Sequence, residues 1–188
     1  MLFELQPKTL VLVCGAPGSG KSTLAQELVK ALPLLLLDKD CLDEAFSPSD
    51  RGKTYDRYFK WGSYQALLNL AALNLRLGKS VLVDAPLTHN LLAEPVWTDR
   101  ILNISLELQA HLRVLQCIAP MEVLRERLEK RGLKRDAAKL TEAGFTDFLR
   151  DHRLDEDNPL PHEKMVMTAE LSVLVQQALA YIQHRPDR

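Results

Sequence analysis

The sequence contains a phosphate-binding motif close to its first residues. Residues 15–22 read Gly-Ala-Pro-Gly-Ser-Gly-Lys-Ser and match the pattern G-x-x-x-x-G-K-[ST] at every position. Glycines allow a loop whose backbone N–H groups point at phosphate oxygens, and a helix that begins after the loop adds the positive end of its dipole. In this pattern Lys21 reaches the β- and γ-phosphates of a nucleotide, and the Ser22 hydroxyl is a ligand for Mg²⁺. The motif therefore predicts binding of a nucleotide with magnesium.

The neighbouring residues favour ATP over GTP and transfer over hydrolysis. The chain has no Asn-Lys-x-Asp sequence of the kind with which small GTPases read guanine. Asp84 ends an apolar run and is placed to hold Mg²⁺ through water, but Ala85 follows it. ATP-hydrolysing machines of the AAA+ type usually carry glutamate there to activate water. Alanine at this position therefore favours transfer of a phosphoryl group to another acceptor.

Two further carboxylates, Asp38 and Asp40, follow the second apolar run. Ligands of open α/β folds bind at the carboxyl ends of the strands, so one of these acids should face the acceptor. A carboxylate that accepts a hydrogen bond from an acceptor hydroxyl can orient it and take its proton. We assign this role to Asp40, whereas Asp38 could support the magnesium shell or a neighbouring backbone group. The alternative for either acid is a helix N-cap ahead of Cys41.

Arginines are concentrated after the fourth apolar run. Arg127 and Arg131 are four residues apart and share one face of a predicted helix. A charged run such as 125–135 is, without context, typical of a solvent-exposed helix surface. Beside a phosphate loop, arginine could instead stack on adenine or bind phosphate with two hydrogen bonds, on a lid that excludes water. We expect such a lid around residues 125–150.

These residues are carried by an alternation of apolar runs and segments of helical periodicity. That pattern predicts an α/β fold of three layers, a parallel sheet with helices on both faces. The expected strands are Thr9–Cys14, Leu34–Leu37, Ser80–Val83, Arg113–Ile118 and Lys164–Met167. Helices are expected in the gaps between the strands, and the clearest are Lys21–Ala31, Tyr55–Leu77, Pro120–Arg131 and Ala169–Gln183. Segments 47–54 and 132–161 interrupt the alternation and are expected to be loop-rich.

Length and composition limit the remaining possibilities. The 188 residues suit a single domain, 1–188. The 24 Lys and Arg against 25 Asp and Glu give a net charge of −1, so nucleic acid is not an expected partner. Three scattered cysteines predict neither disulfides nor a metal site and favour the cytoplasm. No apolar stretch is long enough to span a bilayer, so no membrane partner is expected.

The motifs resemble the zeta-toxin-like and chloramphenicol-phosphotransferase-like P-loop kinases, relatives of shikimate and adenylate kinases. The resemblance rests on four stretches, namely residues 15–24, 38–40, 81–85 and 119–131. It implies five parallel strands in the order 2-3-1-4-5 and an acid after the second strand that acts on the acceptor. It also implies that Arg127 lies on adenine and Arg131 on phosphate.

Motif and resemblance together give the expected site. The catalytic set is Lys21, Asp40 and Arg131. The nucleotide-binding set is Gly15, Ala16, Pro17, Gly18, Ser19, Gly20, Lys21, Ser22, Thr23 and Arg127. The metal set is Ser22, Asp84 and Asp38. The expected cofactors are ATP and Mg²⁺.

The acceptor is not identified by the sequence. Related kinases build their acceptor site around the connection from the second to the third strand, where the candidates are Arg51, Arg57, Tyr58, Trp61 and Tyr64. The alternative is a helix that packs these aromatic rings into the core. His89 also falls near the active edge of the sheet, and Cys41 adjoins Asp40 and could line the site.

Two hypotheses of different class follow. The first is an ATP-dependent phosphotransferase that acts on a hydroxyl of a small molecule. The second is a nucleotide-binding ATPase or switch that acts through a protein partner. End-phosphorylation of nucleic acid is a third option, which the near-neutral charge does not favour.

Overall fold

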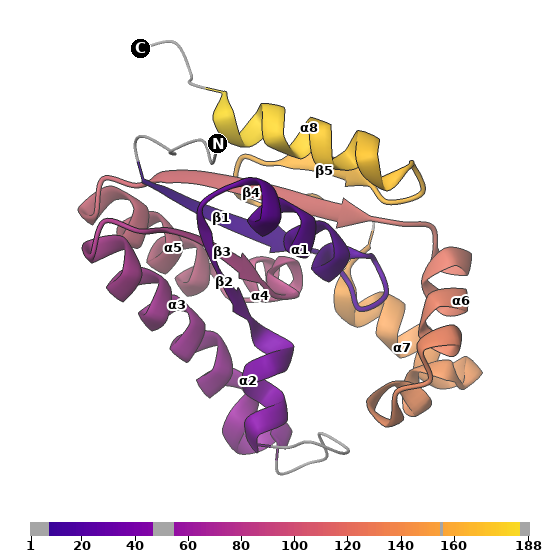
Figure 1. The fold of residues 1–188 in the computed structure, drawn as a ribbon. Coiled ribbons are helices and arrows are strands. Elements are labelled where there is room, and N and C mark those ends of the chain that lie inside the picture. The colour runs from indigo at the N-terminus through magenta and orange to yellow at the C-terminus, as the bar shows by residue number, and fades with distance from the viewer. Residues whose placement is uncertain (1–7, 47–54, 155, 185–188) are drawn as a thin grey trace.

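The computed structural model of this protein describes residues 8–46, 55–154 and 156–184. Its centre is one five-stranded sheet in which every neighbouring pair is parallel (Figure 1). The strands are β1 Thr9–Cys14, β2 Leu34–Asp38, β3 Ser80–Asp84, β4 His111–Ile118 and β5 Glu163–Val166. Their order is β2-β3-β1-β4-β5, which confirms the fold class and the order that the resemblance implied.

Burial explains why these runs form strands. Every residue of β1 and of β3 is buried, as the continuous apolar runs of a sheet covered on both faces require. The edge strands are more open, and Leu35 of β2 is 42% exposed. The free Cys14 and Cys117 are buried in β1 and β4, whereas Cys41 is exposed.

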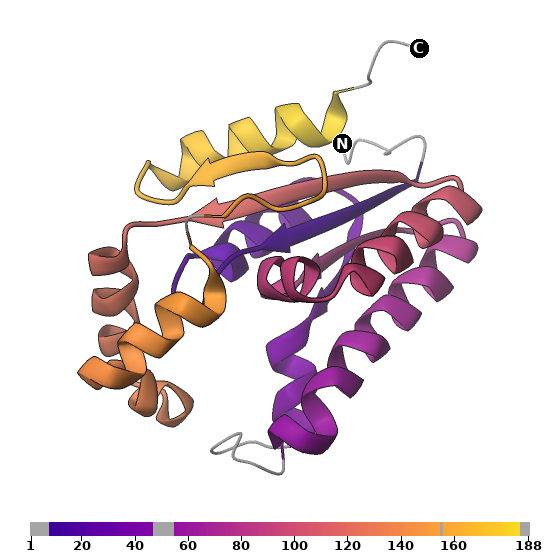
Figure 2. The ribbon, with the colours of Figure 1, turned by 180° about the vertical axis from the view of Figure 1, so that it is seen from behind.

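Helices cover both faces of the sheet. On one face lie α1 (Lys21–Ala31) and α8 (Leu171–Gln183), which pack on Val11 and Val13 of β1. On the other face α3 (Lys60–Arg76), α4 (Leu87–Ala93) and α5 (Pro95–Glu107) pack on Leu10 and Leu12. Figures 1 and 2 show α1 in front of the sheet and α4 and α5 behind it.

The remaining helices lie beyond the carboxyl ends of the strands. The helix after β2 is α2 (Lys39–Phe46), and the π-helical η1 (Tyr55–Phe59) leads into α3. After β4 come α6 (Met121–Arg131), the 3₁₀ helix η2 (Lys134–Leu140) and α7 (Glu142–His152). We call residues 121–152 the lid segment. Figure 1 shows its helices grouped at the carboxyl end of β4.

The lid segment has its own small core, which joins it to the phosphate loop. Leu124 and Leu128 of α6 and Phe145 and Phe148 of α7 are buried together with Ala16. The prediction that segment 132–161 is loop-rich is wrong for most of its length, because η2 and α7 occupy residues 134–152. The Thr141 hydroxyl accepts a hydrogen bond from the Gly144 N–H at 3.1 Å and caps α7. Segment 47–54 lies outside the described residues.

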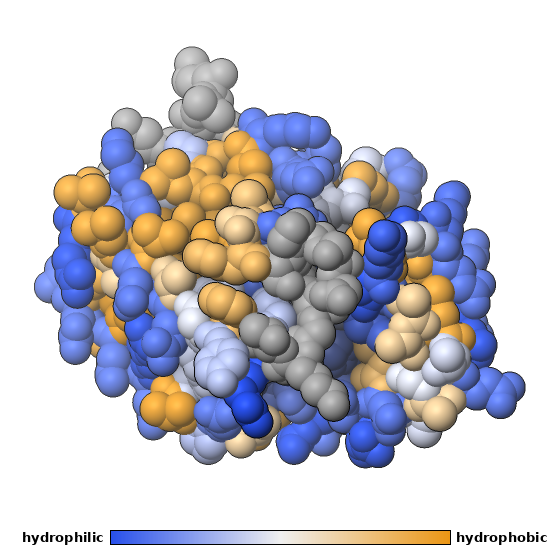
Figure 3. Space-filling model, turned by 90° about the horizontal axis from the view of Figure 1, so that it is seen from below, coloured by the Kyte–Doolittle hydropathy of each residue, from blue (hydrophilic) through white to orange (hydrophobic). Residues whose placement is uncertain are grey.

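Part of the described surface is apolar. Figure 3 shows hydrophobic residues gathered on the side of the molecule where α3 lies. Leu70, Leu73 and Leu77, at the end of α3 and just after it, are exposed and spaced for one helical face. No helix among the described residues is both long enough and apolar enough to cross a membrane.

Candidate nucleotide and acceptor site

The phosphate loop requires glycine at three positions. Gly15, Gly18 and Gly20 have φ values of 146°, 85° and 97°, which residues with a Cβ rarely adopt. A Cβ on Gly15 would lie 2.5 Å from the Cys117 carbonyl oxygen, and one on Gly20 would lie 3.0 Å from the Met167 methyl. The loop therefore passes close to the ends of β4 and β5. It leads into α1, whose first turn holds no acidic residue, so the positive end of that helix is available to an anion.

Asp84 lies at the end of β3, 3% exposed, beside the first turn of α1. Burial raises the pKa of Asp84 to about 6, the charges of Asp38 and Asp40 act in the same direction, and Lys21 and a hydrogen bond with Ser22 oppose the rise. Its Oδ1 is buried and has no hydrogen-bond partner among the described residues. A carboxylate oxygen without a partner beside a hydroxyl is an oxygen donor set suited to Mg²⁺. Ser22 and Asp84 thus fit the expected ion.

Asp38 has a structural role that the sequence left open. Its Oδ1 accepts a hydrogen bond from the Cys41 N–H at 3.0 Å, so Asp38 caps the start of α2. It is also the register partner of Asp84 across β2 and β3. The N-cap alternative therefore holds for Asp38, and its contribution to the magnesium shell remains a prediction.

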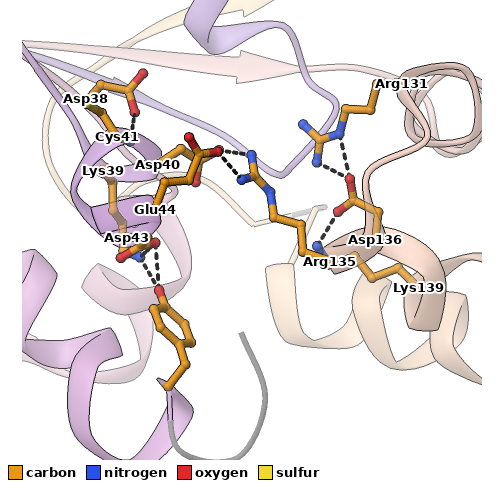
Figure 4. A network of polar contacts seen from close by, with 11 residues as sticks. Asp38, Lys39, Asp40, Cys41, Asp43, Glu44, Arg131, Arg135, Asp136 and Lys139 are labelled. Carbon is orange, nitrogen blue, oxygen red and sulfur yellow. Dashed lines mark hydrogen bonds and ion pairs between the residues drawn. The ribbon is translucent and has the colours of Figure 1, made fainter. Parts of the chain in front are cut away.

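Asp40, in the first turn of α2, is paired with an arginine that sequence reasoning did not assign to the site. Arg135 of η2 extends across to α2 (Figure 4) and places its Nη2 2.6 Å from Asp40 Oδ2 and its Nη1 2.8 Å from Glu44 Oε1. The Arg135 side chain is 15% exposed, whereas that of Asp40 is 40% exposed. One guanidinium therefore joins the lid segment to the acid expected to act on the acceptor.

Arg131 is held by a second unassigned residue, Asp136. This carboxylate is completely buried and lies 2.6 Å from Arg131 Nη2 and from Lys139 Nζ. The Arg131 and Lys139 side chains remain about a third exposed, at 32% and 28%. Asp136 therefore orients two cations of the lid segment, and the contact of Arg131 with phosphate remains a prediction.

Arg127 lies directly against the phosphate loop. Its Nη1 donates to the carbonyl oxygens of Gly18 and Ser19, at 3.4 and 3.1 Å, and its Nη2 donates to that of Met167 at 2.7 Å. Arg127 thus ties α6 to the loop and to the segment after β5. Its expected position on adenine is not tested by these contacts.

The residues predicted for the acceptor pocket differ in burial and do not form one group in the structure. Tyr64 is buried, and its ring lies 5.9 Å from that of Trp97, which also stacks on Trp61. The core-packing alternative therefore holds for Tyr64. Arg57 and Tyr58 are exposed. Arg51 lies outside the described residues.

A buried ion pair lies behind Asp40. Lys39 places its Nζ 2.7 Å from Asp43 Oδ2 and 2.7 Å from the Tyr55 hydroxyl. The same ammonium group lies 4.5 Å from the centre of the Tyr64 ring. The network joins α2 to η1 and α3 and so fixes the helix that carries Asp40. Sequence periodicity could not show that Lys39 and Asp43 point inward.

His89 lies near another residue that the sequence gave no role. The ring of His89 on α4 is 6.3 Å from that of His152 on α7. Burial is the main cause that lowers the pKa of His152 to about 4, and Lys139, His89 and Lys21 add to the effect. A cavity of about 30 Å³ is lined by His152 together with Gly15 and Ser19 of the phosphate loop. His152 is therefore a neutral group behind the loop at pH 7.

The sheet order and the glycine loop define a P-loop nucleotide-binding protein with the fold of the small P-loop kinases. The model of an AAA domain family, AAA_33, matches residues 10–154. This match covers more than half of the chain, so the protein belongs to that family.

Solved structures share the fold. A candidate kinase from Chloroflexus aurantiacus is 24% identical with a TM-score of 0.70, over 94% of this chain and 99% of the other. A gluconokinase from Sinorhizobium meliloti is 17% identical with a TM-score of 0.62, over 94% and 91%. A shikimate kinase from Bacteroides thetaiotaomicron is 15% identical with a TM-score of 0.62, over 92% and 96%. No curated protein sequence matches the chain.

Proposed function

We propose that this protein transfers the γ-phosphoryl group of Mg-ATP to a hydroxyl group of a small molecule in the cytoplasm. The observation that carries the proposal is the convergence of two sets of groups at one end of the sheet. The glycine loop, Lys21 and Asp84 suit the nucleotide, and Asp40 lies in the first turn of α2, two residues after Asp38, the register partner of Asp84. A base and a phosphate site at this proximity suit direct transfer.

The chemistry follows from these positions. The acceptor O–H donates a hydrogen bond to Asp40, and its oxygen forms a bond to the γ-phosphorus. The bond from that phosphorus to the β,γ-bridging oxygen breaks, ADP leaves, and the acceptor proton passes to Asp40. Lys21 offsets the negative charge on the transferred group, and we assign the same role to Arg131 of the lid segment.

Magnesium would be held by Ser22 and, through water, by Asp84, with Asp38 behind them. When bound, the ion neutralises charge on the β- and γ-phosphates. Among the described residues, no group of three or more His, Cys, Asp or Glu side chains is placed to hold a metal ion. The oxygen atoms available for the ion are thus a hydroxyl, one buried acid and the phosphates of the nucleotide.

The resemblance to zeta-toxin-like and chloramphenicol-phosphotransferase-like kinases supports a small acceptor. The proteins with similar folds include a sugar kinase, a gluconokinase and a shikimate kinase. Ala85 after Asp84 supports transfer over hydrolysis, because no glutamate follows to activate water.

The test is a screen of hydroxylated metabolites, nucleosides and antibiotics with labelled ATP. We expect a labelled small product that depends on Mg²⁺. Steady ATP hydrolysis stimulated by a protein partner, with no labelled small product, would instead support the ATPase or switch.

The variant Lys21→Ala tests the role of the phosphate loop in transfer. Loss of one preorganised cation should lower kcat by about 100- to 1,000-fold, the effect of losing one such donor. Folding should persist because Lys21 is only half-buried and is not part of the hydrophobic core clusters, and circular dichroism checks this. Wild-type turnover of ATP by a folded Lys21→Ala protein would refute the role of the loop in transfer.

A further inference from the structure

The guanidinium group of Arg135, which we call the fork, connects the lid segment to α2. Both of its ion-pair partners among the described residues lie on that helix. Its two terminal nitrogens are divided between Asp40 and Glu44, one nitrogen for each carboxylate. Figure 4 shows the guanidinium extended from η2 toward both acids, away from Arg131 and Asp136. The arginine side chain is 15% exposed, while the two acids are 40% and 56% exposed. The guanidinium is thus the enclosed partner and the carboxylates are the accessible ones.

This pairing opposes the role proposed for Asp40. The Arg135 guanidinium contacts Asp40 Oδ2, one of the two carboxylate oxygens with which Asp40 could accept a hydrogen bond from an acceptor hydroxyl. Exchange of Asp40 for another anion on Arg135 would remove the guanidinium from this oxygen.

The geometry of the fork indicates what that anion is. A guanidinium binds the paired oxygens of a carboxylate or a phosphate through two parallel hydrogen bonds, whereas here the two oxygens come from two different side chains. An incoming carboxylate or phosphate would replace two separate, partly exposed contacts with one bidentate contact. Because both carboxylates are partly exposed to water, an incoming anion can exchange with them on Arg135.

We infer that the acceptor carries an anionic group, a carboxylate or a phosphate, which binds Arg135 in place of Asp40 and Glu44 and so removes the guanidinium from Asp40 Oδ2. The inference rests on the proposed function and narrows its substrate class to anionic alcohols. Arg135 thereby determines specificity, and binding of the acceptor is coupled to separation of Arg135 from Asp40.

The first test compares matched acceptors with labelled Mg-ATP. Hydroxy acids and phosphorylated alcohols are each paired with an uncharged analogue, for example gluconate with glucose, glycerate with glycerol and glycerol 3-phosphate with glycerol. We expect transfer to members of the anionic sets, and the two sets distinguish carboxylate from phosphate. Equal or preferred transfer to the uncharged members would overturn the inference and leave the proposed function standing.

The second test substitutes Arg135 and Glu44, the carboxylate that would compete with an anionic acceptor for it. Arg135→Gln should raise the KM of an anionic acceptor by about 10- to 100-fold, the range for a lost charge-assisted pair of hydrogen bonds, and Arg135→Lys should recover part of it. Glu44→Gln removes one competing carboxylate and should lower that KM, by up to about fivefold. Arg150 is an exposed arginine of the same lid segment, so Arg150→Gln is the matched control and should leave the KM of the anionic acceptor unchanged. A role of Arg135 in folding alone would not predict tighter binding in Glu44→Gln, so an unchanged or higher KM there would count against the inference.

A third measurement does not depend on turnover. Malonate and inorganic phosphate are titrated calorimetrically into protein saturated with the non-hydrolysable Mg-AMP-PNP, which fills the phosphate loop. Binding of at least one of them should weaken in Arg135→Gln and strengthen in Glu44→Gln. Anion binding that is absent, or indifferent to both substitutions, would overturn the inference. A normal anion response without transfer to any compound would instead refute the proposed function.

Discussion

Asp40 and Asp84 are both carboxylates at the end of the sheet, but their surroundings differ. Asp84 is buried and hydrogen-bonded with Ser22, whereas Asp40 is half-exposed and paired with Arg135. Burial favours the neutral form of an acid, and an adjacent arginine favours the charged form. The difference in surroundings agrees with the separate tasks that we propose, Asp84 with the ion and Asp40 with the acceptor hydroxyl.

Substitution by asparagine should separate these tasks. Asp40→Asn should keep nucleotide affinity near the wild-type value while transfer falls by roughly 100- to 10,000-fold, the range for general-base catalysis. Asp84→Asn should weaken the magnesium shell, so a higher Mg²⁺ concentration should restore part of the activity of this variant. The activity of Asp40→Asn should not respond to Mg²⁺. Transfer activity measured for each variant as a function of Mg²⁺ concentration tests both expectations. A loss of thermal stability in Asp40→Asn without a loss of turnover would reduce Asp40 to a helix residue.

His152 should make stability depend on pH. Its pKa is lowered to about 4 in the folded protein, chiefly by burial, against an ordinary value of 6.5. The unfolded chain therefore binds more protons between these values, and the free energy of unfolding should fall as the pH drops from about 6.5 to about 4. The contribution is at most about 3 kcal/mol. His152→Phe, which keeps the ring contact with Phe148, should flatten this part of the curve measured by urea unfolding, and an unchanged slope would show that another group causes it.

At the scale of elements, α7 depends on a close contact. Gly144 in its first turn is so near η2 that an added Cβ would overlap the Ala138 carbonyl oxygen. By contrast, Gly62 in α3 has nothing within 4 Å of such an atom. The same substitution should therefore have opposite effects at the two positions.

Gly144→Ala should destabilise the protein by about 1 to 3 kcal/mol, because the lid segment must shift to admit a methyl group. Gly62→Ala should stabilise it by up to about 1 kcal/mol, because alanine loses less backbone entropy in a helix. Thermal unfolding compares the two, and hydrogen exchange should localise the first effect to residues 134–152. Equal effects of the two substitutions would contradict the close packing of η2 on α7.

The sequence predicted the strands well because burial on both faces leaves a direct signal. All five were located to within two residues, and the glycine loop and α1 were identified by motif. Helix α7 was missed because only Phe145 and Phe148 mark its buried face, in a segment that is otherwise charged. Their burial depends on Ala16 and Leu124, which are distant in sequence.

The candidate site was predictable from the sequence only where a local motif defines its residues. Residues defined by the motif, such as Lys21 and Ser22, follow from local spacing. Arg135 and Asp136 do not, because their partners depend on how η2 folds back after α6. The one available signal was the charged run that ends at Arg135, and such a run is typical of solvent-exposed helices.

At the scale of the molecule, the phosphate loop belongs to two packed units. Its backbone continues β1 of the sheet, and Ala16 is part of the core of the lid segment. A nucleotide bound to the loop should therefore stabilise the sheet and the lid segment together.

Ligand-linked stability can be measured directly. At a free Mg-AMP-PNP concentration 100 times its Kd, the free energy of unfolding should rise by about 2.7 kcal/mol. Unfolding should remain a single transition seen equally by tryptophan fluorescence and far-ultraviolet circular dichroism. Lys21→Ala, tested at the same concentration, should show a smaller rise. Two separate transitions, only one of which responds to the nucleotide, would show that the two units unfold independently.

The contact of Arg127 with the phosphate loop also restricts how single peptide units can rotate. In a trans peptide the carbonyl oxygen of one residue and the N–H of the next point in opposite directions. Because Arg127 holds the Ser19 oxygen at 3.1 Å, the Gly20 N–H in the same peptide plane is turned away from the arginine. Rotation of that plane, which glycine would otherwise permit, would break the hydrogen bond. Arg127 thus opposes a peptide flip at a position of the loop where flexible glycine alone would allow two orientations.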